Sequence, residues 1–267
     1  MKLGCSTISY LSLFESGEMT IWDFLDECAR LKLDGVELQD RHFGLASGRP
    51  SLERSFWKRL KDELSSRKLE ISAISPELYF DKPYEQGKLV DVARKIAELE
   101  EWINVAYLLG VHYVRIFPAK IAILKELARY AGSHNVTLVM ENHGAIVQNA
   151  QDHVNLMYAV NSPYLAINLD TGNYPLNLYE NVRSVIRSLG VRHVHLKHYG
   201  YDGIKWIDNP KIISWLYEEN YQGYLSIEYE GPRKDASGAS IEKEVVSEIA
   251  CAFRRRLEYV NKGIILP

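Results

Sequence analysis

The feature that most constrains this sequence is a regular alternation between short apolar runs and longer segments with helical apolar spacing. The pairs follow one another along the whole chain, with no change of composition and no low-complexity linker between them. Strands that alternate with helices in this way predict parallel strands joined by right-handed crossovers. The expected strands are Lys2–Ile8, Gly35–Leu38, Glu70–Ser75, Val111–Phe117, Thr137–Met140, Leu165–Leu169, Val191–Leu196 and Leu225–Ile227.

The segments between the expected strands carry ordinary helix signals. Thr20 has Asp23 three residues on, which is the capping-box pattern, and Gly110 stands where a C-terminal glycine cap is expected. The run 254–256 of three arginines in the last helix is interpreted as a solvated face. The expected helices are Thr20–Leu33, Ser51–Lys68, Gly87–Leu109, a segment after Pro118 that ends at Ser133, Gln151–Val160, Leu178–Leu189, Pro210–Glu219 and Ser240–Tyr259.

Eight strand–helix units in 267 residues favour a closed (β/α)8 TIM barrel, which typically needs about 250 residues. The competing open, doubly wound sheet normally has a glycine-rich phosphate turn after an early strand. The segment Gly4-Cys5-Ser6-Thr7 is not such a turn. We therefore predict an α/β protein with a single barrel domain over residues 1–267.

The composition argues against two classes of partner. A formal net charge of −3 gives no support for binding nucleic acid, and no run approaches the roughly 18 apolar residues that a membrane span needs. Cys5, Cys28 and Cys251 include no C-x-x-C pair, which suits a reducing compartment. We expect a cytoplasmic protein without nucleic-acid or membrane partners, and assembly into a homo-oligomer is left open.

Four consecutive expected strands end in side chains that can bind metals. Glu141, Asp170, His195 and Glu228 lie at those ends and are separated by 29, 25 and 33 residues, each about one strand–helix unit. The carboxyl ends of barrel strands meet at one mouth, so these side chains are expected to converge there. Each residue alone has an ordinary alternative as a helix cap, a salt-bridge partner or a core histidine. Together they would gather three carboxylates, which repel one another at close range unless a cation or protons offset their charge.

The donor set indicates a hard divalent cation. Three carboxylates and one imidazole suit Mn²⁺, which we expect, with Mg²⁺, Co²⁺ or Zn²⁺ as alternatives. The same set gives no reason to expect copper or an iron–sulfur cluster. Four protein ligands leave positions open in an octahedral shell, and a substrate carbonyl with its neighbouring hydroxyl could fill two of them.

The order and spacing of several short segments also resemble a known family. They are similar to those of the xylose-isomerase-like TIM-barrel superfamily, and within it to the sugar phosphate isomerase/epimerase group, over residues 4–259. The resemblance implies that Glu141, Asp170, His195 and Glu228 bind one divalent metal. It also implies that Glu141 and Glu228 are the acid/base pair on opposite faces of a small, sugar-like substrate. The segments are Gly35–Leu38, Tyr113–Phe117, Glu141–His143, Leu169–Asn173, His193–Lys197 and Leu225–Glu230.

The implied activity is that of a metal-dependent sugar or sugar phosphate isomerase or epimerase. Removing a proton from the carbon next to a carbonyl builds charge on oxygen, which a metal stabilises, and a second carboxylate returns the proton on the far side. General acid–base steps of this kind contribute roughly 10²–10⁴-fold. Two departures argue against a free ketohexose: ketose 3-epimerases tend to carry arginine where Tyr201 stands and histidine where Asn173 stands.

Six further residues are candidates for binding the substrate. Lys197 shares strand parity with His195 and is expected to point into the mouth, where it would bind an anionic group or pair with Glu228 or Glu230. The others follow strand ends or lie in loops, where ordinary structural roles are the alternative. The six are Glu37, His42, His143, Asn173, Lys197 and Trp206, and Tyr79, Phe80 and Tyr201 would add aromatic walls.

Three alternative functions are kept beside this one. A dehydratase of a cyclic hydroxyketone, such as inosose or dehydroshikimate, shares the first proton removal, and the segment 4–9 and the pair Glu141 and His143 resemble it. An endonuclease IV-like hydrolase needs three zinc ions, and this chain has Asn173 and Phe117 where further ligands would stand. A non-catalytic barrel is disfavoured, because relaxed sites rarely keep four ionisable groups that are costly without metal.

Overall fold

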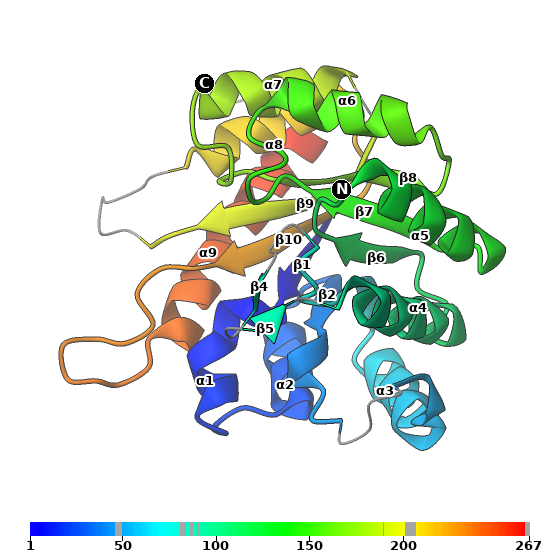
Figure 1. Ribbon diagram of the computed structural model, residues 1–267. Coiled ribbons are helices and arrows are strands. Elements are labelled where there is room, and N and C mark those ends of the chain that lie inside the picture. The colour runs from blue at the N-terminus through cyan, green and yellow to red at the C-terminus, as the bar shows by residue number, and fades with distance from the viewer. Residues whose placement is uncertain are drawn as a thin grey trace.

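Eight strands of the chain close on themselves as a parallel barrel, and the helices surround it (Figure 1). The computed structural model describes residues 1–45, 50–80, 84–85, 88–89, 91–188, 190–200 and 207–264. Each barrel strand pairs with the next one along the chain, and the first pairs with the last, in the order β1-β10-β9-β8-β7-β6-β3-β2. This topology confirms the predicted (β/α)8 fold class.

The barrel strands lie where the sequence places them, with ends that differ by at most two residues. A short antiparallel hairpin, β4 (Tyr84–Glu85) and β5 (Lys88–Leu89), is separate from the barrel. The barrel strands are β1 (Lys2–Ser6), β2 (Gly35–Gln39), β3 (Glu70–Ser75), β6 (Tyr113–Ile116), β7 (Thr137–Glu141), β8 (Leu165–Asp170), β9 (Val191–His198) and β10 (Tyr224–Tyr229).

The helices follow the strands in the expected alternation. Three short 3-10 helices, η1 (Thr7–Tyr10), η2 (Asp40–His42) and η3 (Pro50–Leu52), lie between the longer elements. The α-helices are α1 (Leu11–Glu15), α2 (Ile21–Arg30), α3 (Arg54–Ser66), α4 (Val92–Leu109), α5 (Ile121–Ser133), α6 (Ala150–Val160), α7 (Leu178–Ser188), α8 (Asn209–Glu218) and α9 (Glu242–Asn261).

Two capping signals in the sequence are confirmed. The Thr20 side chain accepts from the backbone N–H of Asp23, and the Asp23 carboxylate accepts from Thr20 N, so the N-terminus of α2 is a complete capping box. Gly110 follows α4 with φ 74°, the left-handed conformation that glycine adopts without strain.

The start of α3 differs from the prediction. The helix begins at Arg54 and not at Ser51, which lies in η3. The Ser51 hydroxyl donates to the Glu101 carboxylate of α4 and therefore does not cap α3. Local sequence does not reveal this partner, because Glu101 is 50 residues further along the chain.

The start of α4 also differs. The predicted start at Gly87 lies outside the described residues, and Lys88–Leu89 pair with Tyr84–Glu85 instead of joining the helix. Asp91 is the N-cap, since its side chain accepts from Arg94 N at 3.0 Å. The predicted helix began too early because the helix propensity of single residues does not reveal this hairpin.

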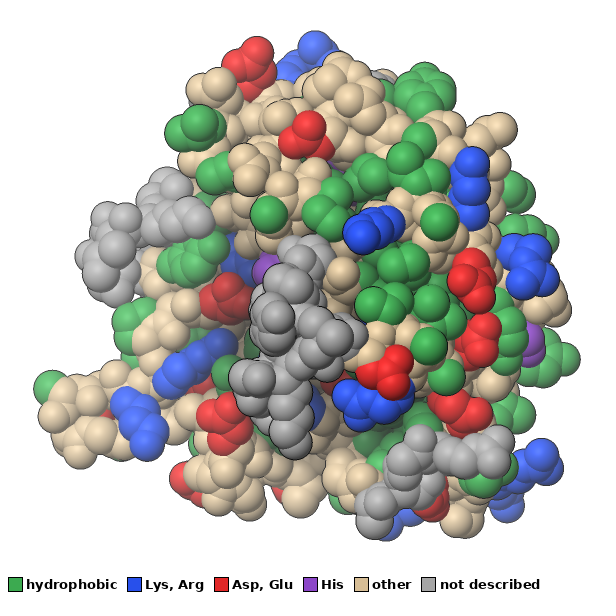
Figure 2. Space-filling model, viewed as in Figure 1, with side chains coloured by type: hydrophobic (Ala, Val, Ile, Leu, Met, Phe, Trp, Pro, Cys, Tyr) green, Lys and Arg blue, Asp and Glu red, His purple; other side chains and the backbone are tan. Residues whose placement is uncertain are grey.

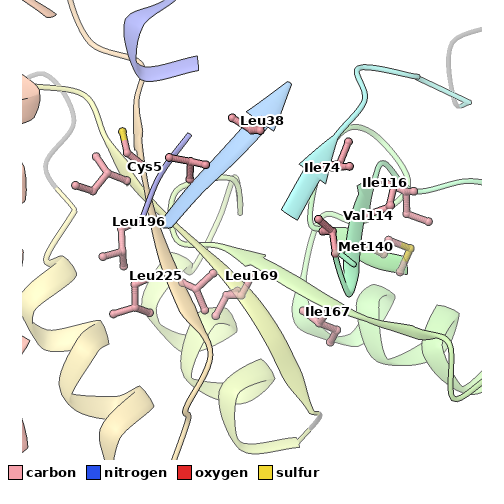
Figure 3. Close-up of a cluster of buried hydrophobic side chains, with 14 of the residues drawn as sticks. Cys5, Leu38, Ile74, Val114, Ile116, Met140, Ile167, Leu169, Leu196 and Leu225 are labelled. Carbon is pink, nitrogen blue, oxygen red and sulfur yellow. The ribbon is translucent and has the colours of Figure 1, made fainter. Parts of the chain in front are cut away.

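Side chains along the barrel strands alternate between an outer apolar layer under the helices and the barrel interior. On β9, Val194 and Leu196 belong to the apolar core, whereas His193, His195 and Lys197 point inward. The interior at this level is therefore polar, which is costly unless each group finds a partner. The labelled core residues in Figure 3 include Leu38, Val114, Ile116, Met140, Ile167, Leu169, Leu196 and Leu225.

The strand register brings the carboxyl ends of β7 to β10 to one level. Asp170 of β8 is paired with His195 of β9, and Glu228 of β10 is paired with Lys197. Glu141 of β7 is paired with Asn168, two residues before Asp170. Inward-facing residues from four strands therefore meet at one end of the barrel.

The predicted solvated face of three arginines is wrong for Arg256. Its side chain is 8% exposed, and its Nε donates to Pro210 O at 3.1 Å, which ties α9 to α8. Arg254 is half-buried and donates to the carbonyl of Lys32 at 2.6 Å, whereas Arg255 is exposed. The three arginines differ in exposure because adjacent residues of a helix lie on different faces, whereas residues three or four apart share one.

The surface that is visible in Figure 2 carries Lys and Arg side chains among Asp and Glu, with no single basic area on this face. In the described part of the chain, no helix combines the length and the apolar character that crossing a membrane requires.

Candidate metal centre

Glu141, Asp170, His195 and Glu228 come together at the carboxyl end of the barrel. Each offers one ligand atom, and these atoms all lie within 4.8 Å of one another. Their exposed fractions are 3%, 0%, 1% and 5%, so the group is buried. From His195 Nδ1 the carboxylate oxygens lie at 3.1 Å (Glu228 Oε2), 3.7 Å (Asp170 Oδ2) and 3.8 Å (Glu141 Oε2).

Local hydrogen bonds fix the Asp170 carboxylate. The Asn142 side chain bridges β7 and β8, donating to Asp170 O at 2.9 Å and accepting from Asp170 N at 2.7 Å. Gly172 N donates to Asp170 Oδ1 at 2.7 Å. One carboxylate oxygen is thus held by the backbone, and Oδ2 is left to face the cluster.

Glu141 is held from two sides. Asn173 Nδ2 donates to its Oε1 at 2.8 Å, so the predicted substrate-binding Asn173 lies at the cluster and acts on Glu141. Arg115 Nε lies 3.5 Å from its Oε2. The Glu141 side chain is therefore oriented by β6 and by the loop that follows β8.

Lys197 points into the mouth, as its strand parity predicts. Its Nζ lies 2.9 Å from Glu228 Oε2, 3.1 Å from Asp170 Oδ2 and 3.1 Å from Glu230 Oε2. These contacts are ionic and not aligned hydrogen bonds, since Asp170 Oδ2 and Glu228 Oε2 have no hydrogen-bond partner among the described residues. The ammonium therefore approaches two of the oxygens that a metal would use.

Sequence reasoning missed Arg115 as a member of the site. It lies on β6, is 2% exposed, and its guanidinium stacks 4.0 Å from the Phe117 ring. Its Nε and Nη1 have no hydrogen-bond partner in the described structure. A signal was present, because Val114 and Ile116 flank this charged residue in an otherwise apolar strand, which is the pattern of an inward-facing functional group.

Glu37 and His193 form a second layer against His195. Glu37 of β2 is fully buried and its Oε1 lies 2.9 Å from His195 Nε2. His193 Nδ1 lies 2.8 Å from Asn168 Oδ1 and its Nε2 lies 3.2 Å from Ser72 Oγ, so both of its nitrogens are engaged. The predicted Glu37 is thus brought to the centre, on the opposite side of the His195 ring from Glu228.

Two other predicted residues lie farther out. The His143 ring packs 4.6 Å from Phe117 and 5.6 Å from Tyr79, which themselves stack at 4.2 Å. The three rings form an aromatic group next to Arg115, and this agrees with the predicted aromatic wall for Tyr79.

The structure does not bring His42 to the centre. Its ring stacks on Phe14 at 4.2 Å, and it lines a separate pocket with Trp22, Phe43 and Phe56. Burial lowers its pKa to about 3, so the ring is neutral. Trp206 lies outside the described residues. His42 follows β2, which also carries Glu37, but η2 turns the His42 ring away from the barrel axis.

The cluster has strongly perturbed pKa values. Burial raises the pKa of Glu141 to about 8, although His195 and Arg115 partly offset this effect, and burial also raises the pKa of Asp170. Burial opposes the charged forms of Glu228 and His195 too, but their mutual attraction holds the pKa of Glu228 well below and that of His195 well above the usual range. Protons therefore supply part of the positive charge that the carboxylates need.

The buried charges indicate what would balance the group. With these protons removed, as metal binding requires, four ionised carboxylates face two permanent cations, which leaves two negative charges in a buried site. A single divalent cation would neutralise them, and oxygen and imidazole donors are the ligands such an ion takes. The residues therefore fit a divalent metal. The carboxylates are Glu37, Glu141, Asp170 and Glu228, and the cations are Arg115 and Lys197.

Comparisons with known proteins agree with this fold. A family model described as xylose isomerase-like TIM barrel matches residues 25–249. The structure of L-ribulose 3-epimerase has a TM-score of 0.73 at 17% identity, over 98% of this chain and 96% of that one. D-allulose 3-epimerase from Methylomonas sp. gives 0.71 at 15% identity, over 96% and 98%. A "probable 3-DHS dehydratase AsbF" from Bacillus anthracis gives 0.70 at 17% identity, over 95% and 99%.

No curated protein sequence matches the chain. At identities of 15–17% the similarity to these solved structures shows the fold alone.

Proposed function

Because this chain belongs to the xylose isomerase-like TIM barrel family, we propose that it is a divalent-metal-dependent isomerase or epimerase of a sugar or sugar phosphate. The observation that carries the proposal is the buried group of four ligand atoms within 4.8 Å of one another, built from the ends of four consecutive barrel strands. Catalytic residues of such barrels come from the carboxyl ends of several strands, which is where this group lies.

Glu141, Asp170, His195 and Glu228 would hold the ion, with Mn²⁺ the expected metal. The ion would act as a Lewis acid on a substrate carbonyl and so favour loss of the proton from the adjacent carbon.

The side chains around the ion have separate roles in the proton transfer. Glu141 and Glu228 come from β7 and β10, with β8 and β9 between them, so they can face a bound substrate from two directions. One carboxylate takes the proton from the carbon next to the carbonyl, and the other returns a proton to the opposite face. Asn173 keeps Glu141 oriented through Oε1, so that Oε2, which faces His195 and Arg115, is the oxygen turned toward the metal and the substrate.

Lys197 and Arg115 supply positive charge beside the reacting group. Both are almost fully buried, at 2% exposure each, so their charge acts through a low dielectric. Lys197 Nζ can donate to a substrate oxygen next to Glu228 or Asp170, and Arg115 can donate from Nε or Nη1. These donors would bind the substrate oxygens and stabilise charge that develops on them.

The proposal is tested by exchange in D₂O. Ketoses, aldoses, ketose phosphates and inososes are incubated with the protein and Mn²⁺, and deuterium incorporation at the carbon next to the carbonyl is followed by NMR. At least one candidate is expected to exchange, and EDTA is expected to stop it. Absence of exchange with every candidate by a metal-loaded protein contradicts the proton-transfer function.

Variants of the two glutamates identify their roles. Glu141→Gln and Glu228→Gln each keep the side-chain shape and are expected to abolish exchange, because an amide cannot take a proton. Glu63→Gln, which removes a charge from the exposed surface of α3, is the matched control and is expected to exchange as the unaltered protein does. Exchange that survives in Glu141→Gln or Glu228→Gln removes that residue from the mechanism.

A dehydratase of a cyclic hydroxyketone is the second candidate. Buried Arg115 favours it, because its Nε and Nη1 have no hydrogen-bond partner among the described residues and could donate to the carboxylate of a dehydroshikimate-like substrate. The dehydratase would eliminate a hydroxyl after the same proton removal, so a conjugated product that absorbs ultraviolet light would accumulate. An endonuclease IV-like activity is not supported, since the described residues offer only two donor groups, which share His195, where such an enzyme needs ligands for three metal ions.

A further inference from the structure

The His195 ring lies between two carboxylates that approach it from opposite sides. Glu37 Oε1 is 2.9 Å from Nε2, and Glu228 Oε2 is 3.1 Å from Nδ1. Asp170 and Glu141 also face Nδ1, so three proposed ligands lie on one side of the ring. On the other side Glu37 is the nearest acceptor, and the Asn168 amide nitrogen, which can only donate, lies 3.2 Å from Nε2. A histidine that binds a metal through one nitrogen carries its proton on the other, and the partner of that second nitrogen decides which one it is.

Glu37 is held inside the barrel by burial and by two hydrogen bonds to one of its oxygens. Its side chain is fully buried and starts from β2, which lies across the barrel from β9. The Ser75 hydroxyl of β3 donates to the same Oε1 that faces His195. Two donors therefore converge on one oxygen, Ser75 from the neighbouring strand β3 and His195 from β9 across the barrel.

We propose that Glu37 is a positioning residue: it accepts the Nε2–H of His195, fixes that tautomer, and so presents Nδ1 to a divalent cation held with Glu141, Asp170 and Glu228. The inference rests on the metal centre of the proposed function and goes beyond it, because it assigns a role to a residue of the first half of the barrel. Carboxylates that accept a proton from a ligating histidine orient the ring and raise its basicity.

The competing role for Glu37 is direct ligation of a second ion with His193 and His195, whose ligand atoms also lie within 4.8 Å of one another. Both His193 nitrogens are already engaged, at 2.8 Å with Asn168 and at 3.2 Å with Ser72. This second group would also place a doubly charged ion against a single carboxylate. Hydrogen bonding by Glu37 needs no rearrangement, so the geometry points to positioning and not to ligation.

Metal affinity is the first test and needs no substrate. Mn²⁺ binding is measured by isothermal titration calorimetry and by the EPR signal of the free ion. Glu37→Ala removes the acceptor and is expected to weaken binding about 10–100-fold, the range for such outer partners. Glu37→Gln keeps an acceptor oxygen and is expected to lie nearer to the unaltered protein, with one ion bound in each case.

Glu230→Gln is the matched control, because it removes one carboxylate charge beside Lys197 without touching His195. Its effect on Mn²⁺ affinity is expected to stay below about fivefold, since Glu230 is partly exposed. Binding by Glu37→Ala that stays within this control range overturns the proposal. Equal, large losses in Glu37→Ala and Glu37→Gln would assign the effect to charge or ligation and would overturn it as well.

The second test uses the unaltered protein, so it does not depend on how a Glu37 variant folds. With ¹⁵N-labelled histidine and Zn²⁺ as a diamagnetic probe, long-range ¹H–¹⁵N correlations report which ring nitrogen carries the proton. His195, assigned by the signals that disappear in His195→Gln, is expected to show a protonated Nε2 and a metal-bound Nδ1. Ligation through Nε2 overturns the proposal but leaves the metal centre intact. Failure of the unaltered protein to bind any divalent ion instead rejects the proposed function.

Discussion

Replacing Lys197 with methionine removes the ammonium among the interior carboxylates and keeps a side chain of similar length. In the metal-free protein Lys197 is 2% exposed and lies within 3.1 Å of Asp170, Glu228 and Glu230. Removing one partner of a buried ion pair costs about 3–5 kcal/mol, because the remaining charges stay buried without compensation. At roughly 2–4 °C per kcal/mol for a chain of this size, the melting temperature in EDTA is expected to fall by about 6–20 °C.

A bound divalent ion should reverse most of this loss. The ion would replace the missing charge on the oxygens of Asp170 and Glu228, so added Mn²⁺ is expected to raise the melting temperature of Lys197→Met more than that of the unaltered protein. For comparison, a ligand at 100 times its Kd stabilises a protein by about 2.7 kcal/mol. The fall in EDTA and the larger recovery with Mn²⁺ are two separate outcomes of one cause.

Differential scanning calorimetry or fluorimetry with EDTA and with Mn²⁺ measures both outcomes. Lys2→Met is the matched control, because Lys2 pairs with Glu70 at 2.6 Å but both side chains are about half exposed, at 48% and 62%. Such a pair contributes about 0–1 kcal/mol, so the control should melt within roughly 4 °C of the unaltered protein in either solution. The reasoning is refuted if Lys197→Met melts like the control in EDTA, or if Mn²⁺ stabilises it no more than it stabilises the unaltered protein.

Three further predictions concern pH, packing and capping. In the metal-free protein the pKa of Glu141 is raised to about 8 and that of His195 is raised as well, so both groups must lose protons before a metal binds. Mn²⁺ affinity should therefore rise with pH between about 6 and 9, and calorimetry should detect the released protons. An affinity that does not change with pH would contradict this reasoning. A Cβ on Gly172 would lie 2.7 Å from Lys197 Cγ, so Gly172→Ala should lower the free energy of unfolding in urea by about 1–3 kcal/mol. An unchanged unfolding midpoint would show that the loop moves to accommodate the methyl group at no cost. Asp91→Ala removes the N-cap of α4 and should cost about 0.5–2 kcal/mol in the same assay, with no change in Mn²⁺ affinity.

Local sequence carried the information for the elements and for the level at which the candidate ligands lie. Strand and helix periodicities are properties of neighbouring residues, so the alternation predicted the barrel, and inward parity predicted that Lys197 faces the mouth. The spacing of Glu141, Asp170, His195 and Glu228 followed from one strand–helix unit, because parallel crossovers return each strand end to the same edge. A helix start was predicted wrongly where the expected capping side chain, Ser51, binds a residue far along the chain, Glu101.

Which side chains meet across the barrel was decided only by the tertiary structure. Glu37 of β2 reaches His195 of β9 because closure of the ring places these strands on facing sides of the interior. Arg115 reaches Glu141 because the register of the neighbouring strands β6 and β7 places the two side chains side by side. His42 follows a strand end as Glu141 does, yet the turn of η2 places its ring in another pocket. The sequence by itself determined the strand and the face of each residue. The partner of each buried charge depends on distances between segments far apart in the chain, and periodicity along one segment contains no record of those distances.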